Sequence, residues 1–587
     1  MSQQEQQVPV QPRTQELDLV KTKKKSNQPF KERFYAFALR YMRKPSSIFA
    51  SRIPKIDEDI QRSNLLISGD TLVAVTMLIT FICAGAFAAG AVVAFYYQVY
   101  ILAAILPFLT LVPLGLGLSM PKISASSRSA AIENELAYVI GYITVLADGG
   151  ISPFSTIKKL ATSGSIFPAI AKEAARIMKD IEILGLDPIS ALEKESRFCP
   201  NRKFGDFLGG YISVLKSGGS VQSYLDSKLK DIFAYRQIKI KSSSELIGTL
   251  AESYIIATVV VGISLFILYL TQNLLNTGVQ TIDPTIIILF SGVFVPGISI
   301  AFIFLTDSAQ VKEPLNFYRP YYAFFIALPF GVLFYFLPVP IPVYVKLGIA
   351  LLIMTTPAMV FSMIHSRQKK AVEAKLPNFL RDISEIRKTG LAPERTIEQV
   401  AGRNYGGLSQ HIKKISTQLS WGVPLRGVLE SFALAVKSWV TRTAAFLLLE
   451  VIDVGGGSSK MFVSLAEFTE KNAQLDKERK SMVKPYVIIP YIGAVLIVVT
   501  TALMAYLLSA PGLNVNPQEA AAFMAPPSVI AQTTNLLLAA SIFQAWFMGI
   551  VAGKLGESTM ADGFKHAVFL VIISLISIYV AQLFIHL

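Results

Sequence analysis

Residues 133–161 read ENELAYVIGYITVLADGGISPFSTIKKLA, and residues 373–401 read EAKLPNFLRDISEIRKTGLAPERTIEQVA. Both stretches are too polar to sit inside a bilayer, yet long apolar segments flank each of them. At a constant offset of 240 residues they match at both ends and at the central turn. The matches include Glu133 and Glu373, Leu136 and Leu376, Gly150 and Gly390, Pro153 and Pro393, Ile157 and Ile397, and Ala161 and Ala401. We infer that a whole unit of apolar and polar segments has been duplicated.

The composition is that of a polytopic membrane protein. Of the 587 residues, 52% are hydrophobic and 16% are charged, and the mean hydropathy is +0.49. A soluble chain carries about 25% charged residues. In such a protein the formal net charge of +15 indicates basic cytoplasmic loops rather than binding to nucleic acid.

The sequence contains no pattern typical of a catalytic, metal or cofactor site. Its two cysteines form no CxxC pair, and its four histidines are scattered without metal-ligand spacing. The run GGGSSK at 455–460 lacks the Gly-Lys-Ser/Thr ending of a phosphate loop and follows an apolar helix rather than a strand. We therefore expect a protein that is not an enzyme and holds no cofactor.

The N-terminal part is polar and basic. Residues 1–29 are rich in Gln, Lys and Pro, which predicts a disordered segment. Residues 30–69 predict an amphipathic helix and a second lead-in helix near 56–67. The aromatic stripe of the first helix, with basic residues beside it, fits either a helix lying on anionic lipid or one packed on the cytoplasmic domain.

About nine apolar runs are long enough to cross a bilayer, which takes about 20 residues. They lie at 71–96, 99–120, 248–270, 284–306, 321–338, 342–364, 485–509, 528–552 and 566–586. The predicted organisation is spans 1 and 2 in 70–120, a soluble domain in 121–247, spans 3 and 4 in 248–306, a short loop in 307–320, spans 5 and 6 in 321–364, a second soluble domain in 365–484, and spans 7 to 9 in 485–587.

The basic residues predict the orientation of these spans. With nine spans, 54 of the 55 Lys and Arg fall on one side of the membrane, and only Lys346, near the outer end of the sixth span, falls elsewhere. Basic loops face the cytoplasm. The pattern therefore predicts a cytoplasmic N-terminus, two cytoplasmic domains and a C-terminus outside the cell.

Each soluble domain is predicted to be a bundle of about six helices separated by glycine turns. Apolar residues recur at helical spacing from Leu136 to Leu146, and Gly150 can cap that helix in the left-handed conformation. Pro153 then suits the first turn of the next helix. Further glycine turns occur near 185 and 422, and the last helix of each domain, near 221–247 and 459–484, can run unbroken into the following span. The expected structural turn residues are Gly149, Gly150, Pro153, Gly218, Gly219, Gly390, Pro393, Gly455, Gly456 and Gly457.

These repeated turns resemble the F domain of type II secretion and type IV pilus systems. Two such domains among nine spans resemble the archaeal form, above all the archaellum assembly platform family or an archaeal pilus counterpart. The resemblance covers about residues 56–587. It implies an all-α membrane protein that sits under a filament, binds a cytoplasmic hexameric secretion ATPase, and couples this motor to insertion of pilin-like subunits. It also implies a homodimer and a role in motility, adhesion or secretion.

Charged residues beside the turns are the candidates for binding the ATPase. They are Asp148, Lys158, Lys159, Arg387, Lys388, Arg395, Glu450 and Asp453. The alternative for each is a solvated face or an ion pair within the bundle. Lys158 and Lys159 correspond to Glu398 and Gln399 in the second copy, so we expect the two copies to contact a partner differently.

A transporter or membrane enzyme is a further alternative. The predicted spans carry no ionisable residue near their centres, whereas coupled transporters place such residues on ion pathways. The duplication is also parallel, with both soluble domains on one side, unlike the inverted repeats of many transporters. Both features argue against transport.

Overall fold

The computed structural model describes residues 30–585 except for 52, 54–55, 64, 66, 97–106, 108–109, 275–284, 311–312, 314–316, 454–458, 510–526 and 558. Three predictions fall outside these residues: the polar segment 1–29, the boundary between the first two spans, and the turn at Gly455, Gly456 and Gly457. Every regular element in the described part is a helix. The chain divides into a small unit, residues 1–133 with 192–209, and a large unit, residues 134–191 with 210–587.

In the small unit an amphipathic helix packs against the first predicted span. Helix α2 (Phe30–Ser51) is kinked at Met42, α3 covers Ile56–Ser63, and α4 covers Gly69–Tyr96. Ala38 of α2 is buried against Ala74 and Leu78 of α4. Phe37 and Tyr41 lie with their rings 4.6 Å apart and stay exposed, so α2 has one packed face and one aromatic face that is open.

The helices of the soluble domains follow the predicted turns. In bundle 1 (residues 121–247) they are α6 (Leu111–Asp148), α7 (Pro153–Thr162), α8 (Pro168–Glu182), α9 (Pro188–Phe198), α10 (Arg202–Ser217) and α11 (Val221–Ile255). In bundle 2 (residues 365–484) they are α17 (Leu376–Arg387), α18 (Pro393–Val400), the short η3 (Gly406–Leu408), α19 (Ser409–Ser420), α20 (Leu425–Ala435), α21 (Trp439–Asp453) and α22 (Ser459–Ser509).

The remaining helices of the large unit are apolar. They are the π-helical η1 (Ile256–Val260), α12 (Val261–Leu274), α13 (Thr285–Leu289), the π-helical η2 (Phe290–Phe294), α14 (Val295–Ala309), α15 (Arg319–Phe336), α16 (Val343–Glu373), α24 (Pro527–Glu557) and α25 (Gly563–Ile585). Across the described residues of the whole chain, nine helices are long and apolar enough to cross a membrane. This number equals that of the spans that the sequence predicts, although the second of these helices, Leu111–Asp148, overlaps only residues 111–120 of the predicted span 99–120.

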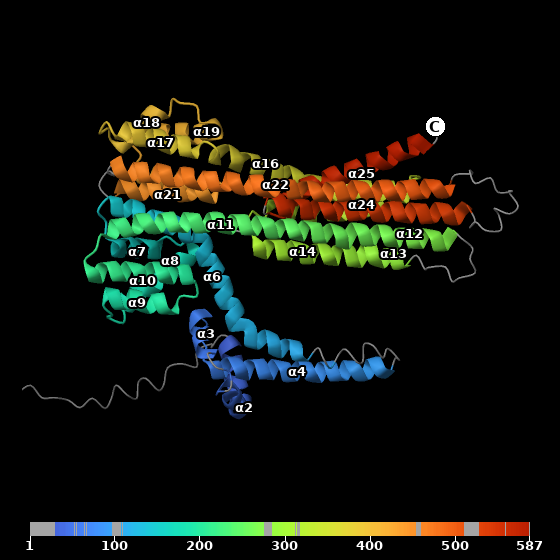
Figure 1. The fold of residues 1–587 in the computed structure, drawn as a ribbon, viewed down its shortest axis with the longest axis horizontal. Helices are drawn as coiled ribbons and strands as arrows, with labels where there is room; N and C mark the ends of the chain where they lie inside the picture. The colour runs from blue at the N-terminus through green and yellow to red at the C-terminus, as the bar shows by residue number, and fades with distance from the viewer. Residues whose placement is uncertain are drawn as a thin grey trace, which may run out of the picture. The chain divides into compact units, whose positions relative to one another are not determined.

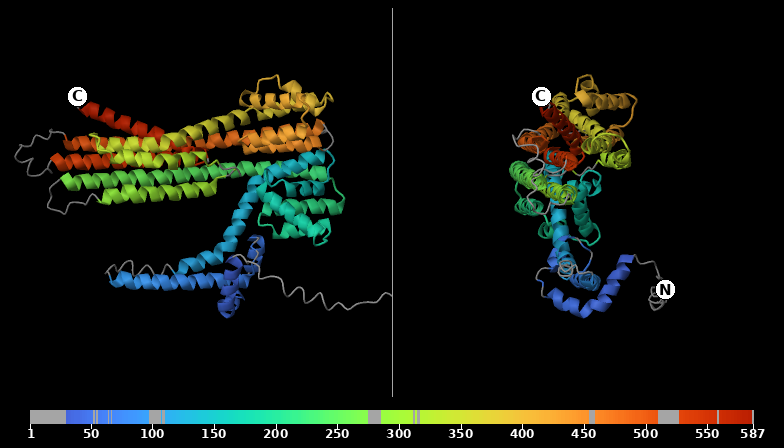
Figure 2. Two further views of the ribbon diagram at one scale, coloured as in Figure 1. Left: turned by 180° about the vertical axis from the view of Figure 1, so that it is seen from behind. Right: turned by 90° about the vertical axis from the view of Figure 1, so that its right-hand side faces the viewer.

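Two helices run without a break from the bundles into predicted spans. Helix α22 begins in bundle 2, at Ser459, and extends to Ser509, and α11 continues through η1 into α12. The two lie side by side in the large unit, with α24 packed along α22 (Figure 1). The right-hand view of Figure 2 looks along these helices.

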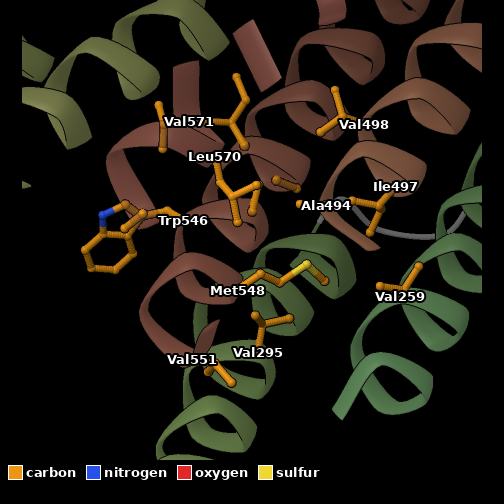
Figure 3. Packing of buried hydrophobic residues seen from close by; sticks show 14 of the residues in the cluster. Val259, Val295, Ala494, Ile497, Val498, Trp546, Met548, Val551, Leu570 and Val571 are labelled. Carbon is orange, nitrogen blue, oxygen red and sulfur yellow. The ribbon is translucent and has the colours of Figure 1, made fainter. Parts of the chain in front are cut away.

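The predicted spans of the large unit pack around one apolar core. Val259 of η1, Ala494 of α22, Met548 of α24 and Leu570 of α25 are buried in it (Figure 3). Helices α24 and α25 approach most closely: a Cβ on Gly553 would lie 2.1 Å from Cα of Gly563. Small residues permit such close contact of helix backbones within a membrane.

The two copies differ at the entrance to the bundle. Helix α6 is unbroken past Leu136, whereas in bundle 2 the chain breaks between α16 and α17 before Leu376. The reason is Pro377, which stands where bundle 1 has Ala137. Proline has no N–H for a helix interior but suits the first turn, where it lies in α17.

Candidate functional site on the two helical bundles

The repeated turn has the same backbone geometry in both copies. Gly150 and Gly390 each have φ of 81°, a left-handed conformation that costs glycine little and other residues more. Pro153 and Pro393 begin the helices that follow. Fully buried Thr156 and Thr396 donate hydrogen bonds to the carbonyls of Ser152 and Ala392, at 3.3 Å and 3.0 Å. The sequence match therefore reflects one local structure used twice.

The other described glycine turns are also left-handed. Gly185, Gly218 and Gly422 have φ of 67°, 67° and 79°. After Gly422, the N–H of Val423 donates to the carbonyl of Gln418 at 3.1 Å, which closes the end of α19. This bond pattern is that of a helix C-terminal cap.

These turns lie at the end of the bundles that is farther from the predicted spans. Lys460, near the start of α22, lies 25 residues before the predicted edge of the seventh span at 485, about 38 Å along a helix. Asp148 contacts Lys460, so the Gly150 turn lies at the same distal end. Helices α7 and α8 pack on each other and lead from this turn back to the Gly185 turn. Helix α17 packs along α22, and α18 to α20 pack in sequence, which places the Gly390 and Gly422 turns at this end as well.

A buried carboxylate joins the two bundles. Glu450 of α21 is 7% exposed. It accepts a hydrogen bond from the Tyr142 hydroxyl of α6 at 3.3 Å, and its Oε2 lies 2.5 Å from the Lys159 ammonium of α7. Burial, followed by the charge of Glu450, raises the pKa of Tyr142, so this phenol stays protonated as the donor.

A second polar cluster joins the bundles at the distal end. The Asp148 side chain is 3% exposed and lies 2.7 Å from the ammonium of Lys460. It also accepts hydrogen bonds from Ser464 and Gln222, each at 2.6 Å. Lys460 and Ser464 belong to α22 of bundle 2, whereas Gln222 belongs to α11 of bundle 1. Asp148 therefore ties its own bundle to the other.

Close packing completes this inter-bundle seam, which we define as the contact of α6, α7, α8 and α11 with α21 and α22. A Cβ on Gly141 would lie 2.3 Å from the ring of Phe468, and one on Gly149 would lie 2.4 Å from the sulfur of Met461. The indole N–H of buried Trp439 donates to the carbonyl of Ile166 at 2.9 Å. The seam thus has the dense packing of a protein interior.

The seam contains several residues that were predicted to bind a partner. Asp148, Lys159 and Glu450 are paired within it. Within bundle 2, Asp453 pairs with Arg426 at 3.1 Å, and Arg387 donates to the carbonyl of Leu391 and lies over the ring of Phe462. For these five residues the structure favours the alternative of an ion pair or hydrogen bond within the fold.

Three of the predicted residues are exposed at or near the distal turns. Lys158 and Arg395 make surface ion pairs with Glu182 at 3.4 Å and with Glu398 at 2.9 Å. Lys388 is exposed directly before the Gly390 turn. Surface ion pairs contribute about 0–1 kcal/mol, so these side chains can leave their partners at little cost.

Exposed apolar residues at equivalent turns were not predicted. Ile183 and Leu184 precede Gly185 and are 72% and 59% exposed. Trp421 precedes Gly422 and is 77% exposed, with Val423 following it at 38%. A large apolar residue beside a turn glycine is the sequence signal that could have found them. We call these four residues the distal apolar pairs.

Glu135 stabilises the start of α8 from inside bundle 1. Its carboxylate, which is 2% exposed, accepts hydrogen bonds from the N–H of Ala169 at 2.9 Å and of Ile170 at 2.8 Å. Burial raises the pKa of Glu135 to about 7, although these two N–H groups favour the charged form. The carboxyl therefore titrates near neutral pH.

No group of three or more His, Cys, Asp or Glu side chains is placed to hold a metal ion within the described ranges.

Comparison with known proteins gives the family of the duplicated domains. The family described as type II secretion system (T2SS), protein F, matches residues 140–269 and 379–505. An uncharacterised protein of Methanocaldococcus jannaschii is 22% identical over 496 residues, which cover 78% of this chain and 81% of that protein. No solved structure matches.

Each family match starts within the first helix of a bundle and ends in the predicted span that follows it. The match thus covers the duplicated unit that the sequence repeat defines. F platform proteins of this family are membrane proteins without enzymatic activity. The chain therefore carries two type II secretion system protein F domains within a multi-pass, all-helical membrane protein.

Proposed function

We propose that this protein is the membrane platform of an archaellum-like or type IV pilus-like filament assembly machine. In this role it docks a cytoplasmic hexameric secretion ATPase and couples the motor to insertion of pilin-like subunits. The observation that carries the proposal is the pair of F domains, whose turns at Gly150, Gly185, Gly390 and Gly422 lie at the end of the bundles distal to the predicted spans. The family implies interaction with a secretion ATPase.

The distal apolar pairs and the basic residues near them form the proposed ATPase contact. Exposed apolar groups on a soluble domain mark sites of protein contact. Lys158, Lys388 and Arg395 are exposed basic residues at or near the same distal turns, and such charges mainly set specificity and the association rate. This combination suits a partner that binds and releases during each cycle and that presents apolar groups within an acidic surface.

The proposed orientation has both bundles and the N-terminus in the cytoplasm and the C-terminus outside. Its support is the distribution of Lys and Arg, which places 54 of 55 on one side. A protease-cleavable tag is placed after Leu587, and the outer cell layers are removed while the cell membrane stays intact. We expect a protease added outside the cells to cut the tag. Protection of that tag, with cleavage only after lysis, would contradict the orientation.

Binding of the cognate ATPase to the full-length protein in nanodiscs tests the docking role. We expect wild-type protein to bind the ATPase and to change its hydrolysis rate. The double variant Leu184→Ser with Trp421→Ser should lose at least about tenfold in affinity, since each change removes about 1.5–3 kcal/mol of apolar burial. Ile238→Ser is the matched control, because Ile238 is 68% exposed on α11 but lies away from the distal turns.

Two outcomes test the platform function and the location of the ATPase contact separately. Absence of any binding by the wild-type protein would refute the platform function. Equal binding by the wild-type protein and the double variant would leave the function standing but refute the distal apolar pairs as the contact.

Motility and adhesion or secretion are distinguished by the phenotype of a deletion strain. We favour the archaellum-like role because two F domains occur in one chain of nine predicted spans. Loss of swimming with normal surface attachment would support it, whereas normal swimming with lost attachment or secretion would support a platform for a different filament. A homodimer in the assembled machine is a further part of the proposal, and mass photometry of the protein in nanodiscs checks it.

A further inference from the structure

A cavity of about 440 Å³ lies between the two bundles, beside the middle of the long helices α11 and α22. Its walls come from α6, α11, α16, α17, α21 and α22, together with Glu313 of the connection after α14. All of these lining residues belong to the large unit. The volume falls within the range of about 300–1,000 Å³ that small-molecule sites have.

The lining carries more positive than negative charge. The cations are Arg236, Lys370, Lys477, Arg479 and Lys480, against the carboxylates Glu313, Glu373 and Asp476. Each carboxylate already has a cation beside it. Lys369 lies 2.6 Å from Glu313 and 3.8 Å from Glu373, and Asp476 contacts both Arg479 and Lys480.

Among the described residues, Arg236 is a half-buried cation of the lining that has no carboxylate within ion-pair distance. Its guanidinium donates to the amide oxygen of Asn472 at 3.2 Å and lies 4.9 Å over the ring of Tyr138. Among the described residues all of its contacts are with neutral groups. A half-buried guanidinium held in this way is suited to bind an anion, above all a carboxylate or phosphate that can accept two of its N–H groups.

The wall beside Arg236 is aromatic and apolar. Tyr138 and Trp439 are almost fully buried, with ring centres 4.4 Å apart, and Leu376 lies in the same lining. Burial of a ligand's planar or apolar part against these side chains would add to the charge interaction. The site therefore combines an anion-binding group with a surface for an apolar body.

The position of Arg236 argues against the headgroup of a membrane lipid. Arg236 lies 12 residues before the predicted edge of the third span at 248, which is about 18 Å along α11. The headgroup layer extends only about 5–8 Å beyond the hydrocarbon core. The phosphate of a lipid in the bilayer plane would therefore not reach the guanidinium.

We propose that this cavity is a binding site for a water-soluble phosphate ester with a planar body, such as a nucleoside phosphate. The phosphate is held by Arg236, with Lys477 in the same lining, and the planar body lies against Tyr138 and Trp439. Because the walls come from both bundles, the ligand bridges the inter-bundle seam and stabilises it. This site is separate from the distal apolar pairs, and the proposal does not rest on ATPase docking.

Equilibrium binding to the full-length protein in neutral-lipid nanodiscs tests the site. The probes are AMP, ATP and inorganic phosphate, and the readouts are Trp fluorescence and the midpoint of thermal unfolding. We expect AMP or ATP to bind with a Kd below about 1 mM, more tightly than phosphate alone. Arg236→Gln should weaken binding by about tenfold or more, because a charge-assisted hydrogen bond is lost. Arg197→Gln, whose side chain is 73% exposed, is the matched control and should bind as the wild type does.

Three outcomes would overturn the proposal. The first is no response to any probe at 5 mM, and the second is an equal response from Arg236→Gln and wild type. The third, from a parallel measurement in nanodiscs that contain anionic lipid, is a higher unfolding midpoint than in neutral lipid with no response to soluble nucleotides, which would assign the cavity to a headgroup. If Arg236→Gln does not fold, the exposed position Lys477→Gln serves instead, with about a two- to fivefold loss expected from a single surface charge.

Discussion

Bundle 1 and bundle 2 have the same backbone conformation at their turns, but residues at equivalent positions make different contacts. Asp148 is buried in the inter-bundle seam, whereas Lys388, at the same place in bundle 2, is exposed. Gly141 is pressed against Phe468, whereas its equivalent Arg381 reaches out to pair with Glu470. These two helix positions are therefore buried in an internal contact in bundle 1 and exposed in bundle 2.

This difference shows what duplication within one chain permits. Two separate identical subunits would present the same residue on both sides of a symmetric interface. Here each copy has its own sequence, so the two bundles can supply different residues to the seam. Gly141 and Asp148 of bundle 1 meet Phe468 and Lys460 of bundle 2, whereas Lys159 of bundle 1 meets Glu450 of bundle 2. The two copies are therefore not interchangeable.

Stability should fall most when a seam residue of bundle 1 is replaced by the residue at the equivalent position of bundle 2. Gly141→Arg places a long cation where a single Cβ already lies 2.3 Å from Phe468. We expect a loss of more than about 4 kcal/mol of unfolding free energy, since overpacking and an unpaired buried charge act together. Thermal unfolding of the purified protein in detergent measures this loss.

A substitution at the equivalent position of bundle 2 is the control. Arg381→Ala removes only an exposed ion pair and should cost about 1 kcal/mol or less. Similar losses for the two variants would show that the seam does not exist as described.

Removal of the seam carboxylate should have the next largest effect. Glu450→Ala leaves the Tyr142 hydroxyl without its acceptor and separates Lys159 from its partner. We expect a cost of about 1–3 kcal/mol, because the hydroxyl is buried whereas Lys159 can turn to water. Asp453→Ala, one helical turn away and more exposed, should cost about 0.5 kcal/mol. Chemical denaturation followed by far-UV circular dichroism measures both losses of unfolding free energy. A larger loss for Glu450→Ala than for Asp453→Ala would distinguish a seam residue from a surface residue.

The position of Glu135 should make stability depend on pH in bundle 1 but not at the equivalent place in bundle 2. Folding raises the pKa of Glu135 from 4.5 to about 7, so the folded state favours the protonated form. The associated stabilisation is present below pH 4.5 and is lost as the pH rises through 7. The equivalent residue in bundle 2 is Lys375, whose side chain has no carboxyl group.

Glu135→Gln should remove this dependence while its amide oxygen still accepts the N–H bonds of α8. Between pH 5 and pH 8 we expect wild type to lose about 1–3 kcal/mol relative to the variant. Unfolding midpoints measured across this range check it, and parallel profiles for the two proteins would refute the assignment to Glu135.

Charge reversals at the exposed positions should have the smallest effect. Lys158→Glu and Lys388→Glu are each expected to lower ATPase affinity by about two- to fivefold, mainly through slower association. The effect should shrink at high salt. Unequal effects would show that the motor contacts the bundles differently, whereas no effect from either would limit the contact to the apolar residues.

Much of the fold could be predicted from local patterns. Apolar runs give the nine candidate spans, and the glycine turns at 150 and 390 fix where helices end, because each signal lies within a few residues. Even the break before α17 has a local cause in Pro377. The seam could not be predicted in this way. Glu450 meets Lys159 from 291 positions away, and no local feature distinguishes a charge that pairs across bundles from one that faces water.

The unbroken path of α22 has a mechanical consequence. Its 51 residues make a rod of about 77 Å, whose one end lies at the distal turns and whose other end lies in the apolar core. A push or twist applied at the first end would arrive at the second without passing through a flexible joint. The rod's softest section is at Pro485 and Pro490, where backbone hydrogen bonds are missing. Any bending under load would therefore concentrate where the rod is predicted to enter the bilayer.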